Sequence, residues 1–277
     1  MKRKSSGKKG VRKAARGARL GQHFLTGTWA AHRLAESVAV RSGETILEIG
    51  PGRGALTREL LATGKHVLAI EKDEVLVEQL KKTFSNEINS GALRIVSDDI
   101  RNVVPEKIEL EQYVVAANIP YYITGEIIRQ FLTTSSQPRA MALLVQKEVA
   151  ERILARDNKE SILSLSVKAY GVPKIVAKVS RGNFSPTPSV DSAILLVDDI
   201  SKKFFNHVTE TDFFAVVRAG FSSKRKFLLS NLAGLFEKAR VQIAFDACGL
   251  SPKVRAEDVS LETWRQLAIE ITSPGMA

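Results

Sequence analysis

The tetrapeptide Asn118-Ile119-Pro120-Tyr121 carries groups that could do chemistry on an aromatic amine such as that of adenine. Such a nitrogen is a poor nucleophile because its lone pair is delocalised into the ring. The side-chain oxygen of Asn118 and the carbonyl of Pro120 could accept the two amine hydrogens and so localise the lone pair. The ring of Tyr121 could stack on the base. The plainer interpretation is a strand-ending turn, for which Asn and Pro are common.

A glycine-rich segment, Glu48-Ile-Gly50-Pro-Gly52-Arg-Gly54, follows an apolar run near residue 45. Glycines here let a ligand approach bare backbone at a turn that opens a helix. A dinucleotide fingerprint has the spacing G-x-G-x-x-G, whereas these glycines stand at every second position behind an acid. The spacing resembles that of class I methyltransferases.

Two further acids stand at the ends of apolar runs. Glu71 could accept both ribose hydroxyls of an adenosine, and Asp99 could accept a hydrogen bond from an adenine amine. Surface acids and a helix cap are the plainer interpretation of each feature alone. Together, three strand-end features in the right order predict a site for S-adenosylmethionine.

The cysteine and histidine content gives no indication of redox or metal-dependent chemistry. Cys248 is the single cysteine and four scattered histidines form no ligand cluster, so we expect neither an internal disulfide nor a metal. A sulfonium methyl is already a strong electrophile. Holding donor and acceptor in line would therefore supply most of the acceleration.

Apolar runs alternate with amphipathic segments through the first two thirds of the chain. This alternation predicts a doubly wound α/β fold with a mostly parallel sheet. Expected strands are 45–50, 66–71, 93–99, 113–120, 142–146, 162–171, 174–180 and 193–199, and expected helices are 55–64, 75–84, 212–221, 226–239 and 261–271. We therefore expect a Rossmann-like class I methyltransferase domain over 21–200 and a small all-helical C-terminal domain over 201–277.

The charge of the chain is concentrated at its start. Of a formal net charge of +11, residues 1–20 carry +9 and no acid, so the remainder carries only +2. We expect a flexible tail that binds RNA phosphates without choosing a sequence. A solubilising arm and an organelle transit peptide stay open as alternatives.

No apolar run reaches the roughly 18 residues that a membrane span needs, and the first residues lack the apolar core of a secretory signal. With 44% hydrophobic residues in 277, the chain can bury a sizeable core. We expect a soluble, cytoplasmic monomer without a membrane partner.

Nine features, all in family order, resemble the KsgA family of ribosomal RNA adenine dimethyltransferases along nearly the whole chain after the tail. They are GQHFL at 21–25, LEIGPGRGALT at 47–57, Glu71, Asp99, NIPYYIT at 118–124, LLVQKEVAERI at 143–153, FSPTPSVDSA at 184–193, SSKRKFLLSNL at 222–232 and RAEDVSLETW at 255–264. Agreement on this scale by chance is implausible.

The resemblance implies the roles of individual residues. The positions that it assigns to S-adenosylmethionine are Gln22, His23, Leu25, Gly50, Gly52, Glu71, Asp99 and Asn118. Phe184 falls on a second aromatic that would sandwich the target adenine with Tyr121. An expected helix start carries three basic residues, Lys224, Arg225 and Lys226. They either contact the RNA backbone or form a solvent-exposed helix face.

The family modifies two adjacent adenines in a hairpin loop near the 3′ end of small-subunit ribosomal RNA and adds two methyls to each. The implied partner is that RNA or the pre-30S particle, with a role in small-subunit biogenesis. Ala117, Ile119 and His23 depart from common family residues in tolerable ways. Ser189 stands where lysine is frequent, which puts an RNA-binding role of its loop in doubt.

Three alternatives remain. The Erm type of methyltransferase shares the fold and the Asn-Ile-Pro-Tyr motif but acts on large-subunit RNA, and the segments 222–232 and 255–264 favour KsgA over it. The basic tail keeps open a second alternative, a non-catalytic ribosome-assembly or transcription factor of the same fold, although the intact cofactor set with Asn118 and Tyr121 favours activity. DNA or protein-glutamine methylation usually carries Asn-Pro-Pro-Tyr, which Ile119 disfavours.

Overall fold

The computed structural model describes residues 22–108 and 110–273, and the basic tail 1–20 lies outside these residues. A seven-stranded sheet in the order β4-β3-β2-β5-β6-β9-β7 forms its centre. The strands are β2 Thr45–Ile49, β3 Val67–Glu71, β4 Leu93–Ser97, β5 Tyr113–Ala117, β6 Ala140–Gln146, β7 Val172–Val179 and β9 Ser192–Asp198. Pairing is parallel from β4 to β6, whereas β9 runs antiparallel to both β6 and β7. The prediction of a mostly parallel α/β sheet is confirmed.

Helices cover both faces of this sheet because its strands are apolar on both sides, as buried parallel strands are. The helices of this region are α1 Thr28–Ser37, α2 Ala55–Ala62, α3 Glu74–Thr83, α4 Ser85–Asn89, α5 Thr124–Thr133, α6 Lys147–Ile153 and α7 Ile162–Lys168. Leu34, Leu60 and Leu80 bring α1, α2 and α3 into one core, and Phe131 and Leu165 bring α5 and α7 into the other. The carboxyl ends of β2 and β5 lie where the strand order reverses, the usual place for a ligand in such sheets.

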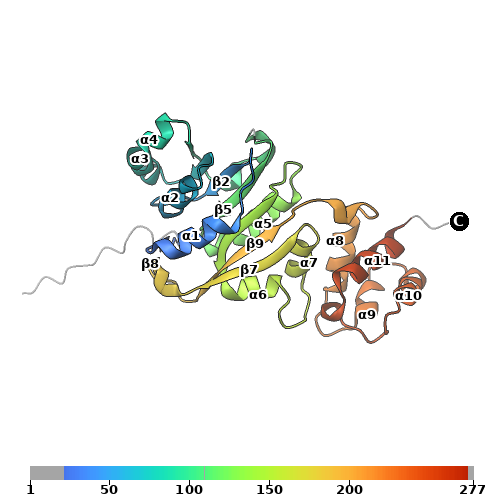
Figure 1. The fold of residues 1–277 in the computed structure, drawn as a ribbon. Helices are drawn as coiled ribbons and strands as arrows, with labels where there is room; N and C mark the ends of the chain where they lie inside the picture. Colours follow the sequence, from blue (N-terminus) through green and yellow to red (C-terminus); the bar gives the residue numbers. More distant parts are fainter. Residues whose placement is uncertain (1–21, 109, 274–277) are drawn as a thin grey trace, which may run out of the picture.

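The described part of the C-terminal region is helical, as expected. It consists of α8 Glu210–Gly220, α9 Leu228–Leu232, α10 Lys238–Ala247 and α11 Leu261–Thr272. These helices lie to the right of the sheet in Figure 1. Trp264 is fully buried at their centre and stacks on Phe221 with ring centroids 5.5 Å apart. Their core is continuous with the α5 side of the sheet, and the boundary at residue 200 stays a prediction.

Two sequence-based expectations about elements are wrong. Residues 162–171 contain α7 and not a strand, because Ser161 and Ser164 form a reciprocal capping box that starts a helix. The helix expected over 226–239 is divided into α9, which ends at Leu232, and α10, which begins at Lys238. Gly234 lies between them, where its backbone N–H donates to the carbonyl of Asn231.

A short antiparallel pair, β1 Phe24–Leu25 and β8 Phe184–Ser185, joins the start of the described chain to the loop before β9. Its register places Leu25 opposite Phe184. Figure 1 shows β8 beside α1, at the end of the sheet away from the C-terminal helices. This pair brings the 22–25 segment to the mouth of the site described below.

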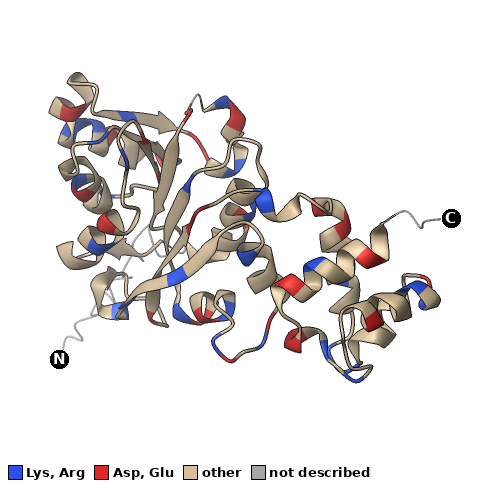
Figure 2. Cartoon of the chain, turned by 45° about the vertical axis from the view of Figure 1, so that its right-hand side comes forward, with Lys and Arg blue, Asp and Glu red and all other residues tan. Residues whose placement is uncertain are grey.

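Within the described residues, no helix is long and apolar enough to cross a membrane. The same part of the chain contains no cluster of three or more His, Cys, Asp or Glu side chains that could hold a metal ion. Figure 2 shows basic and acidic residues interspersed over both the sheet region and the C-terminal helices.

Candidate active site

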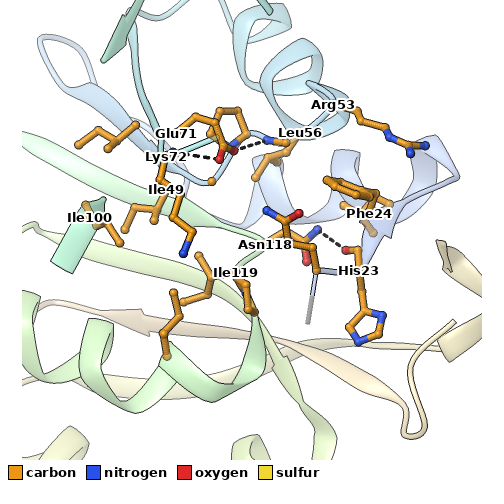
Figure 3. A pocket seen from close by; sticks show the side chains of 18 of the residues that line it. His23, Phe24, Ile49, Arg53, Leu56, Glu71, Lys72, Ile100, Asn118 and Ile119 are labelled. Carbon is orange, nitrogen blue, oxygen red and sulfur yellow. Dashed lines mark hydrogen bonds between the residues drawn. The ribbon is translucent and has the colours of Figure 1, made fainter. Parts of the chain in front are cut away.

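A pocket opens at the carboxyl ends of β2, β3 and β5. All eight residues expected at a cofactor site line it, namely Gln22, His23, Leu25, Gly50, Gly52, Glu71, Asp99 and Asn118. Pro120 lines it as well. Figure 3 shows side chains from separate segments of the chain converging on this space, and the lining residues fall into five segments, 22–25, 49–56, 70–72, 98–100 and 118–123. The structure therefore brings together residues that are up to 98 positions apart in the sequence.

The glycine-rich turn forms one wall of the pocket, between β2 and α2. Gly50, Gly52 and Gly54 have φ of +66°, +60° and +79°, a region that favours glycine. A Cβ on Gly52 would lie 3.0 Å from two ring atoms of Phe24, and one on Gly54 would lie 2.5 Å from the ring of Phe84. Glycine is thus required here by both backbone conformation and close packing.

Glu71, at the end of β3, is buried and its carboxylate is held by backbone. Its Oε2 accepts a hydrogen bond from the N–H of Gly52 at 3.1 Å. Its Oε1 accepts from the N–H groups of Lys72 and Asp73, each at 3.0 Å. Figure 3 shows the carboxylate between the glycine turn and the chain that follows β3. These contacts fix the acid in position before any ligand arrives.

Asp99, which follows β4, is fixed by a cation. The guanidinium of Arg101 donates to both carboxylate oxygens, at 3.1 Å and 2.6 Å, and Lys72 lies 3.8 Å away. The hydrogen bonds from Arg101 lower the pKa of Asp99 to about 2. Asp99 is therefore a carboxylate, able only to accept hydrogen bonds, throughout the physiological range.

Asn118, immediately after β5, is oriented by a backbone contact. Its Nδ2 donates to the carbonyl of His23 at 3.1 Å, as the dashed line in Figure 3 marks. This contact leaves Oδ1 without a hydrogen-bond donor among the described residues. The Pro120 carbonyl accepts one hydrogen bond, from the N–H of Ile123 at 3.2 Å, and a carbonyl can accept two. Both groups retain acceptor capacity beside the pocket.

The two aromatic residues expected to sandwich a base do not line the pocket. Tyr121 is half-buried, its hydroxyl lies 2.6 Å from Ser192 Oγ, and its ring stacks on His23 with centroids 5.7 Å apart. Phe184 is only 3% exposed and packs in the core on the α1 side of the sheet. Their proposed stacking role stays a prediction. It requires the buried Phe184 ring to become accessible to the base.

Glu48 lies beneath the glycine turn and is fully buried. Neither of its carboxyl oxygens nor the hydroxyl of the adjacent Thr57 has a geometrically satisfactory hydrogen-bond partner among the described residues. Burial raises the pKa of Glu48 to about 8, and the nearby charge of Glu71 adds to the increase. A carboxyl in this environment is protonated at neutral pH.

The basic residues Lys224, Arg225 and Lys226 lie away from this pocket, in the exposed turn between α8 and α9. They precede the helix that begins at Leu228, and so do not form its first turn. Lys224 and Lys226 line a separate groove with Arg152 and Arg255. The three residues therefore occupy a surface distinct from the proposed cofactor site.

Several pocket residues were not predicted from the sequence. Arg53 lies over the ring of Phe24, with the guanidinium carbon 4.7 Å from the ring centroid, and the pair closes one side. Ile100 and Ile123 add apolar wall. Tyr122 lines the pocket while being 63% exposed. Its place directly after Tyr121 in the NIPYYIT segment was the available signal.

A family model described as ribosomal RNA adenine dimethylase matches residues 15–273. The chain belongs to this family. The family is of the enzyme class that the sequence resemblance implied, and the match covers both the sheet region and the C-terminal helices.

Curated relatives of the family cover nearly the same length. A ribosomal RNA small subunit methyltransferase A of Dehalococcoides mccartyi is 39% identical over 255 residues, which is 91% of this chain and 87% of the relative. The protein of that name in Moorella thermoacetica is 36% identical over 261 residues and covers 90% of each chain.

Solved structures share the fold. The 23S rRNA methyltransferase ErmE superposes with a TM-score of 0.74 at 25% identity, over 90% of this chain and 99% of that one. A dimethyladenosine transferase from Plasmodium falciparum gives a TM-score of 0.72 at 24% identity, over 88% of this chain and 96% of that one. These likenesses confirm the class I methyltransferase fold.

Proposed function

We propose that this protein dimethylates the N6 amines of two adjacent adenines in the 3′-terminal hairpin loop of small-subunit ribosomal RNA. The methyl donor is S-adenosylmethionine, and the activity serves small-subunit biogenesis. The observation that carries the proposal is the orientation of Asn118, whose amide nitrogen is bound to the His23 carbonyl and whose oxygen is left to accept an amine hydrogen.

The donor set of the pocket fits S-adenosylmethionine. When bound, this molecule supplies an electrophilic methyl group on a cationic sulfur. The buried carboxylate of Glu71 suits the ribose hydroxyls, and the ionised carboxylate of Asp99 suits the adenine amine. Bare backbone at Gly50 and Gly52 allows close approach of the amino-acid portion, with Gln22, His23 and Leu25 covering it.

The residues around the target amine act by positioning. Asn118 Oδ1 and the Pro120 carbonyl accept its two hydrogens, which draws the nitrogen toward tetrahedral geometry and directs its lone pair at the methyl group. The proton released after transfer goes to water. Preorganised acceptors of this kind lower the barrier because they need no reorganisation during the reaction.

Tyr121 and Phe184 sandwich the adenine after it leaves its RNA stack. Phe184 is 3% exposed in this structure, so this arrangement requires the β8 segment to move when RNA binds. The Tyr121 ring is anchored at its hydroxyl by Ser192 and therefore needs less rearrangement.

The RNA partner contacts more than the pocket. We place Lys224, Arg225 and Lys226 against RNA phosphates, because all three are exposed and cationic. The substrate is small-subunit RNA alone or in the pre-30S particle, and the enzyme works as a cytoplasmic monomer. Residues 1–20 add sequence-independent affinity through their charge.

The Erm type remains the second candidate, and the fold does not separate the two. The TM-scores of 0.74 for ErmE and 0.72 for the Plasmodium falciparum transferase are nearly equal. The curated relatives at 36% and 39% identity carry the small-subunit name, which favours the first candidate. A non-catalytic factor would not need the complete pocket.

The substitution Asn118→Ala tests the proposal at its central residue. Methyl transfer to RNA should fall by about 10²-fold or more, as expected for removing one preorganised acceptor. RNA affinity, measured by filter binding, should stay close to wild type because most positioning contacts are to phosphate. Asn206→Ala, at an exposed asparagine, is the control. Wild-type turnover by Asn118→Ala would overturn the assigned role.

A further inference from the structure

A second groove runs between α5, α7 and α8, outside the pocket described above. Residues at helical spacing on α5 form one side of it, from Gly125 through Arg129 to Thr133. Further lining residues come from α6, α7 and α8, among them Arg152, Leu163 and Phe214. The groove therefore lies where the sheet region meets the C-terminal helices, and no residue of it belongs to the proposed cofactor site.

Three arginines line this groove, Arg129 from α5, Arg152 from α6 and Arg218 from α8. All three are exposed, and none forms a side-chain ion pair or hydrogen bond with another described residue. Arginines without acidic partners keep their full charge available for a ligand. Their planar guanidinium groups suit phosphate oxygens.

Among the described residues, one acid lines the groove, and it does not offset this charge. Glu210 forms an ion pair with Lys202 at 2.8 Å and accepts a hydrogen bond from the hydroxyl of Tyr170 at 2.7 Å. Its charge is thus already matched by a cation beside it. The groove as a whole presents an excess of positive charge.

The floor of the groove is apolar. Ile128 and Leu132 of α5 and Leu163 of α7 supply aliphatic surface, and the partly buried Phe214 ring stacks on Tyr170 with centroids 6.2 Å apart. Cationic rims over a floor with an aromatic ring are the usual arrangement for single-stranded nucleic acid, whose phosphates and bases need different surfaces.

The groove connects the two surfaces already proposed to meet RNA. At one end, Gly125 follows Tyr122 and Ile123, which line the catalytic pocket. Arg152 lines both this groove and the one that contains Lys224 and Lys226. The α5 face from residue 125 to residue 133 is about 12 Å long at 1.5 Å per residue. One polymer could therefore follow it from the pocket to the C-terminal helices, whereas a separate acidic protein would not need this continuity.

We propose that the groove between α5, α7 and α8 binds a single-stranded stretch of the RNA substrate that adjoins the target adenines. The phosphates contact Arg129, Arg152 and Arg218, and a base lies on the apolar floor beside Phe214. This inference rests on the proposed function, since it takes the same RNA as ligand. It adds a binding site that extends the RNA contact beyond the pocket.

The test compares two double variants that each remove two positive charges. Arg129→Gln/Arg218→Gln removes two of the three groove arginines. Arg152 is left unchanged because it also lines the groove that contains Lys224 and Lys226. Lys82→Gln/Arg94→Gln removes two exposed cations, free of ion pairs with described residues, from α3 and the edge strand β4. Binding of a small-subunit ribosomal RNA transcript is measured at several KCl concentrations, together with S-adenosylmethionine affinity by calorimetry.

The groove variant should bind the transcript more weakly, and the slope of log K against log salt should shrink by about 2, about 1 for each lost phosphate contact. Its S-adenosylmethionine affinity should match wild type, which shows that the pocket is intact. Phe214→Leu should weaken RNA binding while leaving the salt slope unchanged, because it removes stacking and no charge.

Other outcomes would overturn the proposal. If the groove variant shows the same slope and affinity as the control, RNA does not occupy the groove. If only binding to assembled small-subunit particles falls, a ribosomal protein is the occupant instead. Failure of the wild-type protein to bind both the transcript and small-subunit particles would instead contradict the proposed function itself, so the two failures are distinguishable.

Discussion

Three acids near the glycine turn have the same kind of side chain but different hydrogen-bond partners and burial. Glu71 is held by three backbone N–H groups, and Asp99 is paired with Arg101. Glu48 has neither kind of partner among the residues that the structure describes, and it is fully buried. Two of the acids are therefore preorganised as acceptors, and the third sits below the turn as a neutral group.

Glu48→Gln should remove part of the pH dependence of folding stability. The pKa of Glu48 is about 8 in the folded protein against 4.5 for the free side chain. The folded state therefore retains a proton that the unfolded state loses, and wild-type stability falls as pH rises through this window. Urea unfolding at pH 5 and pH 9 should show wild type losing stability relative to the variant.

Glu74→Gln, at an exposed acid on α3, serves as the control. Parallel pH profiles for wild type and Glu48→Gln would show that Glu48 is ionised in the folded protein, contrary to its burial.

The sequence predicted which residues gather at the pocket, because the carboxyl ends of parallel strands meet at one edge of a sheet. It could not predict how they are oriented. The bond from Asn118 to the His23 carbonyl joins residues 95 positions apart, and the His23 ring contact with Pro186 joins residues 163 apart. Phe184 lies in the β1–β8 pair, opposite Leu25, and no local sequence pattern predicts this pairing between distant segments.

At the scale of elements, the periodicity of apolar residues correctly predicted the strands whose ends form the pocket. It predicted the wrong element over 162–171, where a helix cap determines the structure. The apolar run over 162–171 was compatible with either a strand or a short helix. The Ser161–Ser164 capping box selects the helix, and α7 then covers the sheet instead of joining it. The turn between β2 and α2 was predicted directly, since its glycines occupy backbone conformations with positive φ.

Gly52→Ala tests the close packing of that turn. The new Cβ would meet the Phe24 ring at 3.0 Å, so the pocket wall must shift and S-adenosylmethionine affinity should fall by about tenfold or more. Gly91→Ala is a matched control, because Gly91 has φ of +79° but nothing within 4 Å of a Cβ. Both variants should lose roughly 1–2 kcal/mol of stability to backbone strain.

Calorimetry measures the S-adenosylmethionine affinity of the two variants, which we expect to differ. Equal affinity in Gly52→Ala and Gly91→Ala would mean that the contact with Phe24 does not shape the pocket.

At the scale of the whole molecule, a partly buried ion network ties together strand ends that are distant in sequence. Arg139 donates to Glu44 at 2.5 Å before β2 and to Asp198 at 3.0 Å at the end of β9. Burial pushes the pKa of Glu44 upward. The hydrogen bonds from Arg139 and from the Arg41 N–H, together with the charges of the two arginines, outweigh this effect, and the pKa lies below its ordinary value. The network closes the edge of the sheet opposite the pocket.

Arg139→Met should destabilise the fold by about 3–5 kcal/mol, because it leaves the buried Glu44 carboxylate without its guanidinium partner and with only the Arg41 N–H as a donor among the described residues. Adding Glu44→Gln to this variant should restore part of the loss, since the uncompensated charge is then gone. Urea unfolding measures both. A double variant no more stable than Arg139→Met would show that packing, and not charge, accounts for the contribution of Arg139.

The most direct test of the whole account maps the methylated base. The purified protein is incubated with labelled S-adenosylmethionine and, separately, with unmethylated small-subunit particles, large-subunit RNA and DNA, and the products are analysed by mass spectrometry. We expect dimethyladenine confined to the two adjacent adenines of the 3′-terminal hairpin of small-subunit RNA. Label in large-subunit RNA, or cofactor binding without transfer to any of these substrates, would contradict the account.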